Sequence, residues 1–194
     1  MIPSPDISQV YPKTGIDADP AFRSSRSFVS AGSAMFDDTN DFVNCGDHAN
    51  SQMTTGDFSV AYWAKTVSTA EHFCVSKQDA GIYDGYRFGF EGGNYRCSIQ
   101  VDGSNKTGDV DGNVIVNDGV WHHFAFTVDR SDNLLCYVDG QLDKTVDISS
   151  ISGTIDPAED LILGASYSGG SQNFGGNLCN VGIYKGVVLT QAQI

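Results

Sequence analysis

Residues 119–129 read GVWHHFAFTVD, and residues 133–142 read NLLCYVDGQL. In the first stretch, apolar residues such as Phe124 and Phe126 occupy every second position, which is the period of a β-strand with one buried face. The second stretch carries Asp139-Gly140 between two apolar segments. This pair suits a type I′ turn, because both central residues of that turn need a positive φ. The sequence therefore predicts an antiparallel hairpin here.

Strand signals extend over most of the chain from about Ser27 onward. Apolar and polar residues also alternate over residues 58–65 and 95–102. Further strands are expected at residues 41–46, 71–77, 85–91, 142–148, 160–165 and 177–185. Many short strands separated by Gly-, Asn- and Asp-rich turns are typical of an all-β sandwich or barrel.

Residues 1–27 differ from the rest and hold four of the five prolines. Proline fixes φ and lacks a backbone donor, so we expect an extended N-terminal arm in front of a domain over residues 28–194. Such an arm would dock on protein neighbours in an assembly. The N-terminus lacks a basic start followed by an apolar stretch, so no signal peptide is predicted. No apolar run is long enough to predict membrane insertion.

The 194-residue chain carries 24 acidic and 11 basic residues, a formal net charge of −13. So acidic a surface repels phosphate backbones and argues against a nucleic-acid partner. Only three of the acids are glutamate, namely Glu71, Glu91 and Glu159. The excess of aspartate favours turns and, where aspartates cluster, hard cations.

The five cysteines are widely spaced, and their odd number leaves at least one thiol unpaired within a monomer. Three of them share strand parity with apolar neighbours, so we expect small buried side chains. A disulfide such as Cys74–Cys97 is compatible with the spacing, but the sequence does not select a pairing.

Six blocks of the sequence, in order, resemble the laminin G-like (concanavalin A-like) jelly roll shared by pentraxins and many lectin-type modules. They lie at residues 35–43, 57–65, 75–89, 119–129, 135–140 and 161–184. The resemblance covers about residues 33–193. It implies an all-β, two-sheet antiparallel jelly-roll β-sandwich. It does not by itself imply one function, because this fold serves adhesion, glycan binding and hydrolysis.

No catalytic residues are predicted. His122 and His123 are adjacent on a strand, so their imidazoles point to opposite faces, and the resemblance makes this block structural. A glucanase of this fold needs paired glutamates spaced as Glu-x-Asp-x-Glu, which the chain lacks. A Gly-x-Ser-x-Gly motif is also absent. We therefore expect a protein that is not an enzyme.

Calcium is the candidate cofactor, with Asp37, Asp38 and Asp41 as candidate ligands because calcium prefers hard oxygen donors. The resemblance implies an ion near this segment, helped by an acidic residue on the final strand. Here Cys179 stands at that point, which weakens the implication. The alternative is that these aspartates form turns without an ion. The second acidic segment, residues 102–118, is expected to be a solvated loop.

Glycan binding would use exposed aromatic rings that stack on sugar, together with amides that fix hydroxyl groups. Tyr83, Tyr167 and Asn173 lie in or beside Gly-rich segments and are the candidate ligand-binding residues. The alternative is an ordinary surface loop, since residues 166–174 also have that composition.

The sequence favours a non-catalytic structural or recognition module on the exterior of a larger assembly. A virion (phage) decoration or fibre-type protein with weak glycan binding fits an extracellular-type fold without a leader. The alternative is a free-standing, calcium-assisted carbohydrate-binding (lectin-type) or adhesion module. Either would be located at a virion surface or outside cells.

Overall fold

The computed structural model describes residues 32–81, 83–101, 105–107, 109–167 and 170–194. The arm predicted over residues 1–27 lies outside the described residues. The described part is all β apart from one short 3-10 helix, η2 (Gln191–Gln193). The strands are β1 (Ala34–Asp37), β2 (Val43–Asn44), β3 (Phe58–Lys65), β4 (His72–Gln78), β5 (Gly85–Glu91), β6 (Asn94–Val101), β7 (Asn105–Lys106), β8 (Val110–Ile115), β9 (His122–Val128), β10 (Asn133–Val138), β11 (Gln141–Asp147), β12 (Ile162–Leu163) and β13 (Gly175–Lys185).

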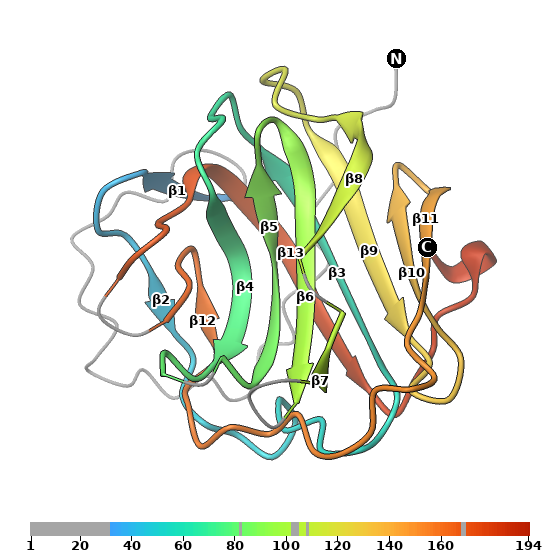
Figure 1. Ribbon diagram of the computed structural model, residues 1–194. Helices are drawn as coiled ribbons and strands as arrows, with labels where there is room; N and C mark the ends of the chain where they lie inside the picture. Colours follow the sequence, from blue (N-terminus) through green and yellow to red (C-terminus); the bar gives the residue numbers. More distant parts are fainter. Residues whose placement is uncertain (1–31, 82, 102–104, 108, 168–169) are drawn as a thin grey trace.

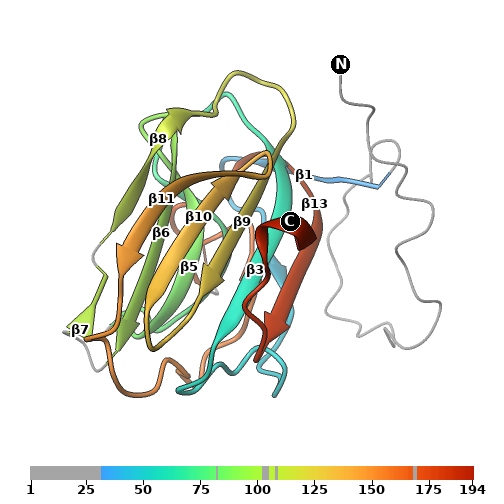
Figure 2. The ribbon, with the colours of Figure 1, turned by 90° about the vertical axis from the view of Figure 1, so that its right-hand side faces the viewer.

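These strands form two antiparallel sheets stacked face to face (Figures 1 and 2). The first sheet has the order β1-β13-β3-β9-β10-β11. The second has the order β2-β12-β4-β5-β6-β7, and β8 also pairs with β6. Because chain neighbours such as β12 and β13 belong to different sheets, the connections cross between the layers. The predicted two-sheet jelly-roll sandwich is confirmed.

The core between the sheets is rich in aromatic rings. Phe88 of β5 and Phe126 of β9 pack across the sandwich with ring centroids 4.6 Å apart. Their positions alternate with outward residues, as the period of two predicts. A second apolar cluster lies on the outer face of the first sheet, where Tyr137 packs near the C-terminal Ile194.

The Asp139-Gly140 hairpin is confirmed. It joins β10 to β11, and its two residues have φ values of 50° and 76°, both positive as a type I′ turn requires. The strands predicted at residues 41–46 and 160–165 are shorter than expected, since only β2 and β12 pair there. The prediction of a solvated loop over residues 102–118 is wrong where the structure has strand β8. This strand pairs with β6 and is anchored by the buried Val110.

The charged side chain of Lys77 lies inside the sandwich. Lys77 of β4 is fully buried and its Nζ donates to Asp47 Oδ1 at 2.8 Å. Nζ also donates to the carbonyl oxygens of Pro157, at 3.0 Å, and Glu159. The ammonium therefore ties two loops to β4, and its burial is offset by three oxygen partners.

Candidate binding face

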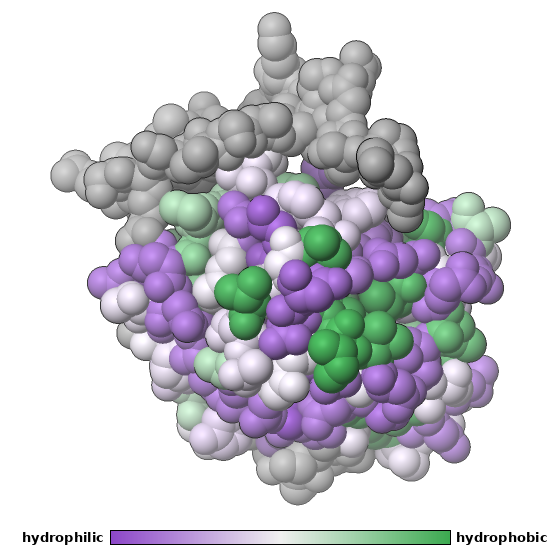
Figure 3. All heavy atoms as spheres, turned by 90° about the horizontal axis from the view of Figure 1, so that it is seen from above, coloured by the Kyte–Doolittle hydropathy of each residue, from purple (hydrophilic) through white to green (hydrophobic). Residues whose placement is uncertain are grey.

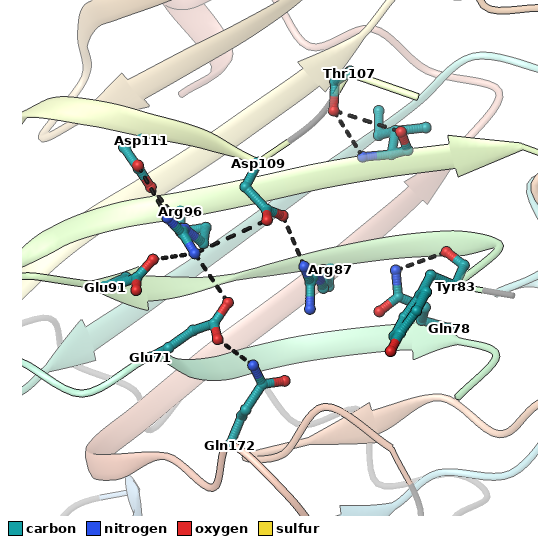
Figure 4. Close-up of polar contacts among 11 residues, drawn as sticks. Glu71, Gln78, Tyr83, Arg87, Glu91, Arg96, Thr107, Asp109, Asp111 and Gln172 are labelled. Carbon is teal, nitrogen blue, oxygen red and sulfur yellow. Dashed lines mark hydrogen bonds and ion pairs between the residues drawn. The ribbon is translucent and has the colours of Figure 1, made fainter. Parts of the chain in front are cut away.

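The outer side of the second sheet is polar where the inner side is aromatic. Tyr86, Phe88 and Phe90 of β5 are buried in the core, so the residues between them, Arg87 among them, point outward. The same alternation on β6 places Arg96 outward. We call the outward group the polar face; its members are Glu71, Arg87, Glu91, Arg96, Asp109, Asp111 and Gln172 (Figure 4).

Arg96 is the centre of the polar face. Its Nε and Nη2 donate to the two carboxylate oxygens of Asp111 at 2.7 and 3.0 Å, a bidentate pair. Its Nη1 donates to Glu71 Oε1 at 3.0 Å and also ion-pairs with Glu91. The hydrogen bonds that Arg96 donates to Asp111 raise the pKa of Arg96 above its ordinary value. Residues from β5 and β8, together with Glu71 just before β4, thus converge on the guanidinium of one β6 residue.

Arg87 holds the neighbouring part of the polar face. Its Nη2 donates to Asp109 Oδ1 at 2.7 Å, and its guanidinium lies over the ring of Phe73, 4.5 Å from the centroid. Gly89 of β5 pairs with Phe73 of β4, and a Cβ atom at Gly89 would approach the backbone carbonyl oxygen of His72 to 2.0 Å. Glycine is required there because any side chain would push β4 and β5 apart.

The amide of Gln172 extends the polar face beyond the sheet. The side chain of Gln172 donates its Nε2 hydrogen to Glu71, and the backbone carbonyl oxygen of Gln172 accepts the backbone N–H of Phe73 at 3.2 Å. The loop after β12 therefore runs beside β4. Two guanidinium groups face four carboxylates across the polar face, so its balance of charge is negative.

Tyr83 borders the polar face at the other end of β4. Its side chain is 51% exposed, and its carbonyl oxygen accepts the Nε2 hydrogen of Gln78 at 2.8 Å. Figure 4 shows Tyr83 beside Gln78, away from the end of β4 that holds Glu71. The backbone of Tyr83 has a φ of 63°, an uncommon conformation for a residue with a side chain.

The other two predicted glycan residues lie in the loop after β12. Tyr167 is half-buried and its hydroxyl accepts a hydrogen bond from Ser171 at 3.0 Å. Asn173 is buried and donates its Nδ2 hydrogen to the carbonyl oxygen of Asp41 at 3.4 Å. The structure thus joins Asn173 to the predicted metal segment. No hydrogen bond between described residues joins Tyr83 to Tyr167 or Asn173.

The predicted calcium ligands form a local turn. The carboxylate of the buried Asp41 accepts the N–H of Asp37 at 3.1 Å. Asp37 Oδ1 accepts the N–H of Thr39 at 3.1 Å, while the exposed Asp38 has a φ of 65°. Within the described residues, no group of three or more His, Cys, Asp or Glu side chains is placed to hold a metal ion. A calcium ion at these residues stays a prediction.

The two adjacent histidines of β9 point to opposite faces, as predicted. His122 Nδ1 and Nε2 lie 2.8 Å from Asp139 Oδ2 and 3.2 Å from Asp118 Oδ1. The ring of His123 packs on Trp63 of β3 with centroids 5.2 Å apart, on the outer side of the first sheet. The His122 ring thus contacts two aspartates at turns, and the His123 ring packs on a neighbouring strand.

An apolar rim lies at the end of the sandwich that Figure 3 views. It consists of the exposed residues Val67, Ile115 and Val120. Their loops are tied together, since the N–H of Gly119 donates to the Thr66 carbonyl at 3.0 Å. The N–H of Gly92 donates to the Thr69 carbonyl at 3.0 Å, which places the rim next to the Glu71 and Glu91 end of the polar face.

The polar face was not predicted from the sequence, although a signal for it is present. The stretch 94–101 carries Arg96, Ser98 and Gln100 on alternate positions, which is the outward side of a strand. The residues that join Arg96 come from distant segments: Glu71 lies 25 residues before it, and Gln172, which contacts Glu71, lies 101 residues from Glu71. Alternation marks which residues face outward, but it does not show which distant residues join them.

Comparison with known proteins supports the fold. A laminin G model, described as the concanavalin A-like lectin/glucanases superfamily, matches residues 37–194. The mouse laminin alpha1 chain, domains LG4-5, has a TM-score of 0.64 and 16% identity, covering 84% of this chain and 44% of that one. The binding domain of Paraclostridial Mosquitocidal Protein 1 has a TM-score of 0.61 and 15% identity, covering 84% and 46%.

A carbohydrate-binding module is also similar. The Ruminococcus gnavus IT-sialidase CBM40, bound to alpha2,3 sialyllactose, has a TM-score of 0.60 and 18% identity, covering 82% of this chain and 94% of that one. The chain spans less than half the length of the laminin and mosquitocidal chains it matches. A search of curated proteins finds no match.

In the part of the chain that the structure describes, no helix combines the length and apolar character needed to cross a membrane. The laminin G model covers most of the described residues, and the two sheets have the order set out above. The chain therefore belongs to the concanavalin A-like lectin/glucanases superfamily, as a laminin G-like jelly roll.

Proposed function

We propose that this chain is a non-catalytic binding module that holds a neutral oligosaccharide on its polar face. The observation that carries the proposal is the set of hydrogen-bond donors and acceptors around Arg87 and Arg96, fixed by mutual contacts before any ligand arrives. Sites of this kind bind with little loss of side-chain freedom. The fold neighbours, among them a carbohydrate-binding module and the binding domain of a mosquitocidal protein, support a binding role.

The polar face carries the chemistry that sugar hydroxyl groups need. Carboxylates accept hydrogen bonds from hydroxyl groups, while guanidinium and amide groups donate to them. Next to these groups, the exposed ring of Tyr83 supplies a surface on which a sugar ring can stack. The apolar rim supplies a second apolar contact at the other end.

The charge balance favours neutral sugars. Both arginines are already ion-paired, and the polar face and the whole chain are negative. A sulfated or carboxylated glycan would therefore be repelled. Sialyllactose, which the Ruminococcus module binds, is such an acidic sugar. The two modules are expected to differ in ligand class while sharing a fold.

A glycan array with neutral and acidic oligosaccharides, followed by calorimetry, tests the proposal. We expect saturable binding of a neutral glycan. Glu71→Gln and Gln172→Ala should each weaken it about 10-fold, because each removes a contact of the polar face. Thr145→Ala, on the exposed surface of β11, is the matched control and should bind normally. Equal binding by all variants would place the ligand elsewhere.

The same samples separate binding from hydrolysis. Glu71 and Glu91 both contact Arg96 Nη1, although they lie far apart in sequence. A glycosidase needs one protonated carboxyl as the acid, whereas here both carboxylates pair with a guanidinium. We expect no release of reducing ends from the bound glycan. Release that is lost in Glu71→Gln would replace the binding role with a hydrolytic one.

Calcium at Asp37, Asp38 and Asp41 is proposed as an accessory ion for this module. What supports it is the oxygen-rich character of these side chains and the contact from Asn173 to the same segment. Calorimetric titration with calcium chloride tests it. Binding that disappears in Asp38→Asn, together with glycan binding sensitive to a chelator, is the expected result. If titration of the wild type with calcium chloride produces no heat of binding, the chain does not bind calcium at these residues.

Display on the exterior of a larger assembly, such as a virion decoration or fibre-type protein, is proposed as the setting. The proline-rich residues 1–27 and the acidic character of the chain support it. Purified particles from the source should contain the protein, and deletion of residues 1–27 should abolish its incorporation. Full incorporation of the deletion variant would show that the arm does not dock.

A further inference from the structure

Two cysteines from facing sheets meet in the core. Cys97 lies on β6 of the second sheet and Cys136 on β10 of the first, and both are fully buried. Their Sγ atoms are 3.7 Å apart. Stacked sheets lie about 10 Å apart, so two short side chains come this close only where they are directly opposed. The pair spans the sandwich from one layer to the other.

The other three cysteines are placed differently. Cys74 is fully buried on β4, and burial raises the pKa of its thiol. Cys45 and Cys179 are half-buried and lie away from the core pair. Among the described residues, no other two cysteines share a hydrogen bond. The structure therefore selects one pairing that the sequence left open, and it is not Cys74–Cys97.

We propose that Cys97 and Cys136 are oxidised to a disulfide that joins the two sheets. The oxidant is a small-molecule disulfide such as oxidised glutathione. One thiolate attacks its sulfur and releases one glutathione thiol. The second cysteine then attacks the mixed disulfide and releases the other. The protein loses two protons and two electrons in total, and the S–S bond of the oxidant is reduced to two thiols.

The local backbone suits the closure that the bond requires. A disulfide needs the two sulfurs at about 2.05 Å, so the thiols must approach one another from their present separation. The pairing of β10 with β11 changes register between Cys136 and Tyr137, a bulge next to one of the two cysteines. Bulges bend the strand locally and relax the ladder of hydrogen bonds. The backbone at Cys136 can therefore shift enough to bring the two sulfurs together.

Burial determines when the bond forms. The hydrogen bond with Cys136, together with burial, raises the pKa of the Cys97 thiol. Because the thiolate is the reactive form, exchange in the folded protein is slow. Oxidation is expected while the chain folds, before the core closes. A bond formed in this way is protected from reductants afterwards, as suits a protein that works outside cells.

The experiment refolds the full chain with a mixture of reduced and oxidised glutathione, and a parallel sample with a thiol reductant. Free thiols are then alkylated in denaturant, and the protein is digested and mapped by mass spectrometry. We expect a peptide pair joining Cys97 to Cys136 in the oxidised sample, while Cys45, Cys74 and Cys179 are alkylated. The oxidised protein should unfold about 10 °C higher than the reduced one.

Variants separate the outcomes. Cys97→Ala and Cys136→Ala should each leave the remaining partner alkylated and remove the difference in melting temperature, whereas Cys179→Ala should keep both. Because the peptide map uses the wild type, the result stands even where a core variant fails to fold. Alkylation of both cysteines in the oxidised wild type would overturn the proposal, as would a bond between Cys74 and Cys97.

Discussion

His72, at the start of β4, is a buried base without a hydrogen-bond partner. Its imidazole is fully buried, and neither ring nitrogen has a partner among the described residues. The ring packs edge-on against Phe174, with centroids 5.1 Å apart. Burial lowers the pKa of His72 to about 4. The neutral imidazole behaves here as an aromatic core residue.

This lowered pKa predicts a loss of stability in acid. The unfolded chain takes up the proton at about pH 6.5 and the folded chain only near pH 4, so the contribution is complete above pH 6.5 and is lost as the pH falls. Between pH 7 and pH 4.5 the loss should be about 2–3 kcal/mol. Urea unfolding of wild type and His72→Phe measures it. Equal losses in both would contradict the prediction.

Lys77 is the second residue whose burial has a measurable consequence. Its ammonium is fully buried and donates hydrogen bonds to Asp47 and to two carbonyl oxygens. Lys77→Met keeps the approximate length of the side chain but removes the ammonium from the Pro157 and Glu159 carbonyl oxygens and from Asp47, whose Oδ1 keeps only the hydrogen bond from Gln52. The variant should lower the free energy of unfolding by about 2–4 kcal/mol. Lys185→Met is the control, since exposed Lys185 donates to a carbonyl at the surface; its cost should stay below about 1 kcal/mol. Chemical denaturation compares them.

At the scale of the element, the β10–β11 hairpin depends on the backbone of Gly140. A Cβ atom there would meet nothing within 4 Å, but the φ of 76° disfavours a side chain. Gly140→Ala should therefore destabilise the protein by about 1 kcal/mol through backbone strain alone. Gly56→Ala is the control, because Gly56 lacks a positive φ and a Cβ there makes an ordinary contact. Thermal unfolding of both variants tests whether conformation, not space, fixes this glycine.

The elements also differ in how far the sequence revealed them. β3, β9 and β10 were predicted because inward apolar residues alternate regularly along each of them. β8 was missed, since only Val110 of this strand is buried, and its aspartate and glycine residues favour turns. Its pairing to β6 is supported by the Arg96–Asp111 ion pair, a contact between residues from two strands. The composition of the β8 segment alone cannot show an ion pair with a residue of another strand.

At the scale of the whole molecule, the charge of −13 sets how binding should depend on salt. The electrostatic field of the protein does not strengthen the binding of a neutral glycan. Its dissociation constant should therefore change less than about 2-fold between about 0.05 and 0.5 M sodium chloride, where screening of charges changes greatly. Calorimetry at several salt concentrations measures this. Binding that weakens steeply with salt would instead indicate attraction of a charged ligand.

The sequence by itself determined the period-two strands and the Asp139-Gly140 turn, because alternation and turn chemistry are properties of adjacent residues. It also determined the family, through the resemblance of six blocks in order. Only the tertiary structure decided which distant residues meet: Glu71 and Asp111 at Arg96, and Cys97 at Cys136. These contacts depend on strand order and on how the two sheets stack. Both follow from packing of the whole core, which no short stretch of sequence contains.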